Sequence, residues 1–96
     1  MIHIKLFKQV GPFAENKDIA ANIRLNKLIP ALEKNQNIIL DFEKIEGATQ
    51  AFIHVLISDL MRGYGDDVLD KIQFKSCNNI LKSIISIVVG YMQESD

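Results

Sequence analysis

Three short segments with strand-type patterns alternate along this 96-residue chain with longer segments of helical periodicity. Apolar and polar side chains alternate in residues 2–6, which is typical of a half-buried strand, and they do so again in residues 72–75. Residues 38–42 are mostly apolar, which predicts a central strand buried on both faces. The resulting order β-α-β-α-β-α predicts a single small α/β domain over residues 1–96, with a parallel or mixed sheet and packed helices.

The first helix is predicted to begin near residue 17, after a cap at Asn16 or Asp18. Pro30 lacks the N–H that would bond the carbonyl of Asn26, so we expect a kink or a new helix start there. Apolar residues at helical spacing form the predicted core-facing stripe, which consists of Ala21, Leu25, Leu28, Ile29 and Leu32.

The second helix is predicted over residues 50–62, with Thr49 as its N-cap and Gly63 as its end. Residues 64–70 then form a solvated acidic loop, and a last helix begins at a cap on Asn78 or Asn79. The side chains that we expect in the core are Leu40, Phe42, Phe52, Leu56 and Ile72.

Charge and composition exclude several classes of function. The chain has 11 basic and 12 acidic residues, and this balance argues against a nucleic-acid partner. Its longest uncharged stretches, residues 47–58 and 83–93, are shorter than the about 18 residues of a membrane span, so we expect no membrane partner. A single cysteine, Cys77, cannot form an internal disulfide and favours a cytoplasmic location, where we expect it to be a small buried apolar group.

Several segments, taken in order, carry a resemblance to a known family. They are Gly11-Pro12-Phe13-Ala14, Leu28-Ile29-Pro30-Ala31-Leu32, Ile38–Phe42, Ile45-Glu46-Gly47 and Ile72-Gln73-Phe74, together with the helix around Phe52. With these segments, the stretch from Gly11 to about Tyr91 resembles the STAS-like family of unknown function. The resemblance implies a STAS-type α/β sandwich and a regulatory module with a protein partner, such as a kinase-like regulator of the anti-sigma type.

The resemblance also bears on phosphorylation. STAS domains of anti-sigma-factor antagonists are switched by phosphorylation of a serine at the start of the helix that follows the central strand. In this chain Ala51 stands where the STAS-like family often has a serine, and Thr49 is the sole hydroxyl close by. We therefore expect no serine switch at this helix start.

Four side chains near the central strand and the second helix are candidates for a regulatory or ligand-facing role: Asp41, Thr49, Gln50 and His54. Each also has a structural explanation. Asp41 can cap the amides of the following loop, and Thr49 can cap the helix. Gln50 and His54 belong to a polar stripe, spaced by four, that continues through Ser58 and Arg62 and is expected to be solvated.

No spacing in the sequence assembles a nucleophile, a base and an orienting group, and none matches a metal or cofactor site. We therefore expect a non-catalytic regulatory or protein–protein interaction module without cofactor or metal. The alternative is a small enzyme or a nucleotide- or anion-binding domain that uses the loop after Asp41 and the helix start at Thr49. A third hypothesis is a structural subunit that self-assembles.

The last helix is apolar on more than one face, whereas a helix lying on a sheet buries one stripe. Leftover apolar surface predicts an interface, and we expect it to include Ile87 and Tyr91. The expected occupant is a second copy of the chain, giving a homodimer, or a different protein. The competing interpretation is a last helix buried on all sides.

Overall fold

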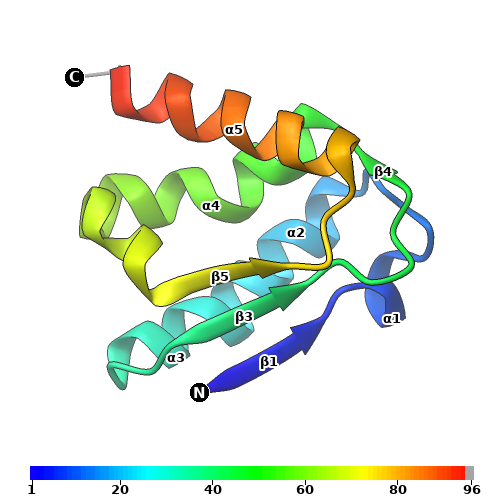
Figure 1. Ribbon diagram of the computed structural model, residues 1–96. Helices are drawn as coiled ribbons and strands as arrows, with labels where there is room; N and C mark the ends of the chain where they lie inside the picture. Colours follow the sequence, from blue (N-terminus) through cyan, green and yellow to red (C-terminus); the bar gives the residue numbers. More distant parts are fainter. Residues whose placement is uncertain (95–96) are drawn as a thin grey trace.

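A parallel three-stranded sheet lies at the base of the fold in the computed structural model, which describes residues 1–94 (Figure 1). Its strands are β1 (Ile2–Lys5), β3 (Ile38–Asp41) and β5 (Ile72–Lys75), in the order β1-β3-β5. Both pairings are parallel, and Ile38 is aligned with Ile2 on one side and with Ile72 on the other. The α/β class and the three predicted strands are confirmed.

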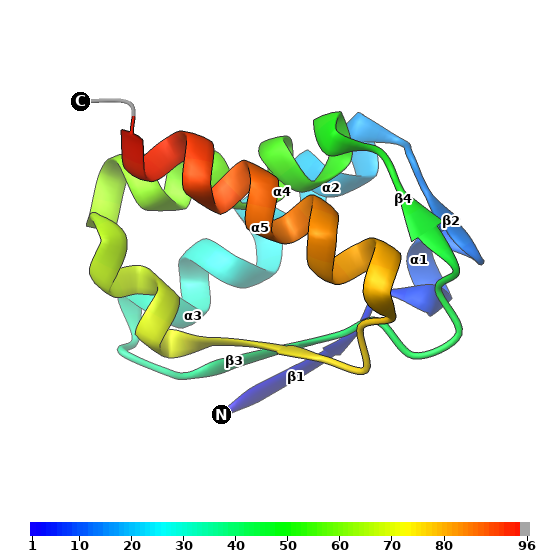
Figure 2. The ribbon, with the colours of Figure 1, turned by 45° about the horizontal axis from the view of Figure 1, so that its top comes forward.

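The helices cover one face of this sheet (Figure 2). They are α2 (Lys17–Ile23), α3 (Ile29–Glu33), α4 (Gln50–Tyr64) and α5 (Asn79–Glu94). On the covered face Ile38 and Leu40 are buried, but Ile39 on the other face is partly exposed. The prediction that β3 is buried on both faces is therefore wrong, because successive crossovers place their helices on the same side.

The first predicted helix is divided into three parts by a π-helical turn. Asn16 caps α2 as predicted, since its Oδ1 accepts from the backbone N of Asp18 at 2.9 Å. The π turn, η1 (Arg24–Leu28), follows directly, and α3 then starts with Pro30 in its first turn, which confirms the predicted new start. Pro30 cannot donate to the carbonyl of Asn26, and the π turn just before it, in which the backbone N of Ile29 donates to the carbonyl of Arg24, accommodates this missing hydrogen bond.

The π turn changes which side chains reach the core. Ile23 and Leu28 are both buried although they are five positions apart, the spacing of one π turn. Leu25 is 54% exposed and Ala21 is only half-buried, so the predicted stripe is wrong at these two positions. Ala20 and Ile23 occupy the core instead.

Short elements that the sequence analysis did not predict connect the larger ones. They are α1 (Phe7–Val10), the paired strands β2 (Phe13–Ala14) and β4 (Gly47–Ala48), and the 3-10 helix η2 (Asp66–Lys71). The predicted acidic loop is thus largely helical, and Val68 anchors it in the core. The β2–β4 pair holds the beginnings of α2 and α4 together, because the backbone N of Thr49 also donates to the carbonyl of Ala14 at 3.0 Å.

Both long helices begin as predicted. Thr49 Oγ1 accepts from the backbone N of Phe52 at 3.0 Å, and Asn78 Oδ1 accepts from that of Leu81 at 2.9 Å. However, α4 does not stop at Gly63: it runs to Tyr64 and ends at Gly65, whose φ of 80° requires a residue without Cβ. The core between sheet and helices contains all five predicted side chains, namely Leu40, Phe42, Phe52, Leu56 and Ile72. None of the helices described is both long and apolar enough to cross a membrane.

Candidate functional site

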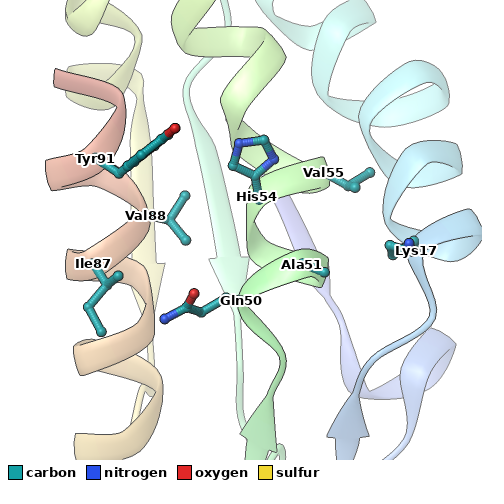
Figure 3. Close-up of a pocket in the computed structure, with 8 residues that line it drawn as sticks. All are labelled: Lys17, Gln50, Ala51, His54, Val55, Ile87, Val88 and Tyr91. Atoms are coloured by element: carbon teal, nitrogen blue, oxygen red, sulfur yellow. The ribbon is translucent and has the colours of Figure 1, made fainter. Parts of the chain in front are cut away.

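A groove of about 530 Å³ runs from α5 across the first turns of α4 to the start of α2 (Figure 3). We call it the α4–α5 groove; its lining residues are Lys17, Gln50, Ala51, His54, Val55, Ile87, Val88 and Tyr91. Gln50 and His54, two of the four predicted ligand-facing residues, line this groove. The two predicted interface residues, Ile87 and Tyr91, line it as well. Asp41 and Thr49 do not line it.

The wall on α4 follows from the cap at Thr49 and from helical spacing. The cap fixes the first turn so that Phe52 and Ile53 enter the core, while Gln50 and Ala51 remain exposed. His54 lies one turn beyond Gln50; the Gln50 side chain points toward α5, and the His54 ring lies between Tyr91 and Val55 (Figure 3). Ala51 and Val55 were not predicted as site residues, although the same four-residue spacing places them on the neighbouring line, toward α2.

Ser58 continues the polar stripe of α4 inward rather than toward solvent. It is 2% exposed, and its Oγ lies 3.4 Å from Nδ1 of His54. The prediction of a solvated stripe through Ser58 is therefore wrong, whereas Arg62 is exposed as expected. Ser58 is buried and does not line the α4–α5 groove, so its hydroxyl is a hydrogen-bond partner for the His54 imidazole.

The wall on α5 belongs to a helix with two adjacent apolar stripes. The inner stripe is buried against the core and consists of Leu81, Ile85, Val88 and Met92. The outer stripe consists of Ile80, Ile84, Ile87 and Tyr91. Ile80, Ile87 and Tyr91 are 60%, 53% and 64% exposed, so the interpretation of a last helix buried on all sides is wrong. The predicted exposed apolar surface is present.

Lys17 and Val88 complete the α4–α5 groove, and the sequence analysis identified neither as a site residue. Val88 is buried in the inner stripe and forms the floor between α4 and α5. Lys17 is the first residue of α2, and it reaches the groove because the β2–β4 pair holds the starts of α2 and α4 together. That pairing joins segments more than thirty residues apart, so no local pattern identifies Lys17.

Asp41 lies on the face of the sheet opposite the helices and has both carboxylate oxygens engaged. His3 Nε2 donates to Oδ2 at 2.7 Å, and the backbone N of Glu43 donates to Oδ1 at 2.9 Å. The hydrogen bond from Glu43, followed by that from His3, holds the pKa of the Asp41 carboxyl below its ordinary value. The capping role expected from the sequence is confirmed.

Within residues 1–94, no three His, Cys, Asp or Glu side chains are grouped in a way that could hold a metal ion. Cys77 is partly buried against the core rather than fully buried, and burial raises the pKa of its thiol. A raised pKa keeps the thiol protonated and therefore weakly nucleophilic.

Comparison with known proteins identifies one family. The model of the STAS-like domain of unknown function matches residues 20–82, from α2 to the first turn of α5. No curated protein and no solved structure matches the chain. The match includes Gln50, Ala51 and His54 of the α4–α5 groove, whereas Ile87 and Tyr91 lie beyond it. Because the match spans most of the chain and the fold agrees with it, this protein belongs to the family of STAS-like domains of unknown function.

Proposed function

We propose that this domain is a non-catalytic regulatory module that binds a partner protein, and that the α4–α5 groove with the outer stripe of α5 is its docking surface. The observation that carries the proposal is the exposure of Ile80, Ile87 and Tyr91 beside a groove of about 530 Å³. Exposed apolar side chains at a hollow with a few polar groups are typical of protein interfaces. The single cysteine supports a cytoplasmic location.

The occupant that fits this surface best is an apolar helix of a different protein. The outer stripe, at positions 80, 84, 87 and 91, has the alternating spacing of four and three residues found along the seam of two packed helices. A helix laid beside it contacts Ile87 and Tyr91 on one side and Gln50 and His54 on the other. Two copies packed through α5 alone leave their grooves unfilled, which favours a different protein over a second copy.

The state of the polar groups supports a binding role over the enzymatic alternative. That alternative depends on Asp41 and Thr49, but both Asp41 oxygens accept hydrogen bonds and Thr49 Oγ1 caps α4. In the α4–α5 groove, His54 has a buried serine as its neighbour, and no acidic side chain among residues 1–94 lines the hollow. A catalytic base requires an accessible nucleophile or substrate proton within hydrogen-bond reach, together with an orienting group.

Cross-linking in the native host tests the docking surface. A photoreactive amino acid at Ile87 is expected to yield a covalent adduct with one partner, whereas the same amino acid at Lys82, on another side of α5, is not. The adduct is identified by mass spectrometry, and the partner is then produced separately for calorimetry. Equal cross-linking from both positions, or none from Ile87, contradicts the proposal. An adduct between two copies assigns the surface to a homodimer.

Affinity measurements with charge-matched variants provide the second part of the test. Ile87→Glu is expected to weaken binding of the purified partner by at least about tenfold, because an anchoring apolar contact is worth more than about 1.4 kcal/mol. Lys82→Glu is expected to change the affinity less than about twofold, since a charge at the rim or outside an interface contributes little. Circular dichroism checks that both variants are folded. A similar loss for both variants excludes docking at the outer stripe.

We further propose that this module is not switched by phosphorylation at the start of α4. Ala51 occupies the acceptor position, and the Thr49 hydroxyl is hydrogen-bonded to the backbone of Phe52. A kinase would have to break this cap, which stabilises a helix by about 1 kcal/mol. Incubation with host lysate and ATP, followed by phosphosite mapping, is expected to show no abundant phosphate on Thr49. Stoichiometric phosphate there overturns this part of the proposal.

A further inference from the structure

We propose that the free edge of β1 is a second binding site, which takes an extended acidic peptide segment as an additional strand. The first observation is the direction of the backbone groups. Ile2 N donates to the carbonyl of Asn37 at 2.9 Å, and Leu6 N donates to that of Asp41 at 3.1 Å. Because backbone groups alternate in direction along a strand, the N–H and C=O groups of His3 and Lys5 point away from β3.

These backbone groups are accessible. Strand β1 is at the edge of the sheet, and no other strand within residues 1–94 pairs with its outer side. Two hollows of about 380 and 230 Å³ lie along it. Since His3, Ile4 and Lys27 line both hollows, we treat them as one channel, the β1 channel, between the strand and η1–α3. An extended chain in this channel lies within hydrogen-bonding reach of the strand edge.

The charge of the β1 channel selects its occupant. Four lysines line it, namely Lys5, Lys8, Lys27 and Lys34, and none of the acidic residues that the structure describes does. The ion pairs found in residues 1–94 involve His3, Arg24 and Arg62, so none of the four lysines has an acidic partner there. Uncompensated positive charge beside a free strand edge attracts a segment rich in Asp or Glu.

The same lysines argue against a second copy as the occupant. Pairing of two β1 edges would place the lysines of one copy against those of the other, and like charges across a strand pair are destabilising. Lysines at an edge also prevent uncontrolled pairing between sheets. Acidic residues on an added strand remove this repulsion, while the backbone hydrogen bonds supply affinity that does not depend on the side chains.

A six-residue peptide of alternating glutamate and valine is the probe for this site, with binding followed by NMR on the full chain. The amide protons of His3 and Lys5 are expected to shift and to exchange more slowly with water when the peptide binds, because they become hydrogen-bonded. Binding is expected to weaken as salt is added. Absence of binding at millimolar peptide, or binding without protection of these two amides, overturns the proposal.

Control peptides separate strand addition from simple charge attraction. Replacing glutamate by glutamine tests the charge. Methylating the backbone nitrogens of alternate residues, in two analogues that cover both sets of positions, removes the N–H donors of one peptide edge at a time. We expect the glutamine peptide and one of the two methylated peptides to bind at least about tenfold more weakly. Unchanged affinity for both methylated analogues excludes an added strand.

Variants of the protein locate the site. Lys27→Glu is expected to weaken binding of the glutamate peptide at least about fivefold, because it reverses a charge in the β1 channel. Lys82→Glu makes the same change in net charge on α5 and is expected to leave the affinity within about twofold. Ile87→Glu alters the other docking surface and is also expected to bind the peptide normally, so the two proposals fail independently. Equal binding by Lys27→Glu and Lys82→Glu contradicts the assignment.

Discussion

Asp41 is a buried carboxylate, 3% exposed, that joins two neighbouring strands at the open face of the sheet. It accepts from His3 on β1 and from the backbone of Glu43 just beyond β3. Its position at the end of the central strand makes Asp41 a candidate ligand-facing residue, because ligands often bind there in open α/β sheets, and capping of the following loop is its structural explanation. In the structure each carboxylate oxygen accepts one hydrogen bond, which agrees with the capping explanation.

The lowered pKa of Asp41 makes the stability of the fold dependent on pH. A carboxyl whose folded-state pKa is depressed stabilises the fold fully above its unfolded value of about 3.9 and loses that contribution as pH falls through the folded value. Asp41→Asn is expected to flatten this acid limb and to lower the free energy of unfolding at pH 7 by about 1–3 kcal/mol. Urea unfolding between about pH 2 and pH 7 measures both effects.

A suitable control for Asp41→Asn is Asp66→Asn, which changes an exposed aspartate of η2. The control is expected to retain the acid limb of the unmodified protein. The interpretation is wrong if Asp41→Asn and the unmodified protein lose stability in parallel on acidification.

Two glycines near the end of α4 are expected to respond oppositely to the same substitution. Gly63 is inside the helix and has open space where a Cβ would be, so Gly63→Ala is expected to stabilise the fold by about 0.5–1 kcal/mol. Gly65 has φ 80° and ψ −179°, a conformation nearly restricted to glycine, so Gly65→Ala is expected to destabilise by about 1–3 kcal/mol. Thermal unfolding measures the stability change in both variants. If both substitutions stabilise the fold, or both destabilise it, α4 does not end between Gly63 and Gly65.

At the scale of elements, the π turn η1 decides which face of the first helical segment is buried. A regular α-helix would carry a single stripe from α2 into α3, which is the basis on which Leu25 was predicted to be in the core. The turn at Arg24–Leu28 inserts the equivalent of one extra residue into the helix. The next buried side chain after Ile23 is therefore Leu28, and Leu25 faces solvent. Pro30 directly after it cannot donate to the carbonyl of Asn26, which favours such an irregularity at this place.

Alanine substitution of Leu25 and Leu28, both within η1, tests this phase shift. Leu28→Ala is expected to lower the free energy of unfolding by about 2–5 kcal/mol, because Leu28 is fully buried. Leu25→Ala is expected to change it by less than about 0.5 kcal/mol, since that side chain is more than half exposed. Chemical denaturation measures both. A loss at Leu25 as large as that at Leu28 would support the regular helical stripe, in which both side chains face the core.

At the scale of the whole molecule, one layer of helices on one face of a small sheet produces a single core and leaves three surfaces open. These surfaces are the uncovered face of the sheet, the β1 channel and the outer stripe of α5. The core centres on fully buried aromatic and aliphatic side chains, among them Phe42 and Phe52. With so few elements to cover it, α5 keeps exposed apolar side chains, among them Ile80, Ile87 and Tyr91.

Phe52→Ala tests whether the layer between sheet and helices is a single core. Its side chain is 0% exposed, and its removal is expected to destabilise the fold by about 3–5 kcal/mol. Phe13→Ala is the control, because that ring is 48% exposed and is expected to contribute about 1 kcal/mol or less. Denaturant unfolding with unchanged slope reports both values. A loss below about 1 kcal/mol for Phe52→Ala would contradict the packing.

Local interactions explain what the sequence by itself determined about this protein. The caps at Asn16, Thr49 and Asn78 bond to amides two or three residues away, and strand patterns depend on alternation within a few positions. The family resemblance and the α/β class follow from the same local segments in order. The spacing of Gln50 and His54 on one helical face was likewise predictable, as was the excess apolar surface of α5.

Tertiary structure alone decided the features that depend on contacts between distant segments. The β2–β4 pairing brings Lys17 to α4, and the packing of α5 on α4 brings Tyr91 to the groove that His54 lines. The one-sided placement of the helices leaves β3 uncovered on its other face. Sequence periodicity describes which side of an element is apolar, but which neighbour covers that side is determined by long-range packing.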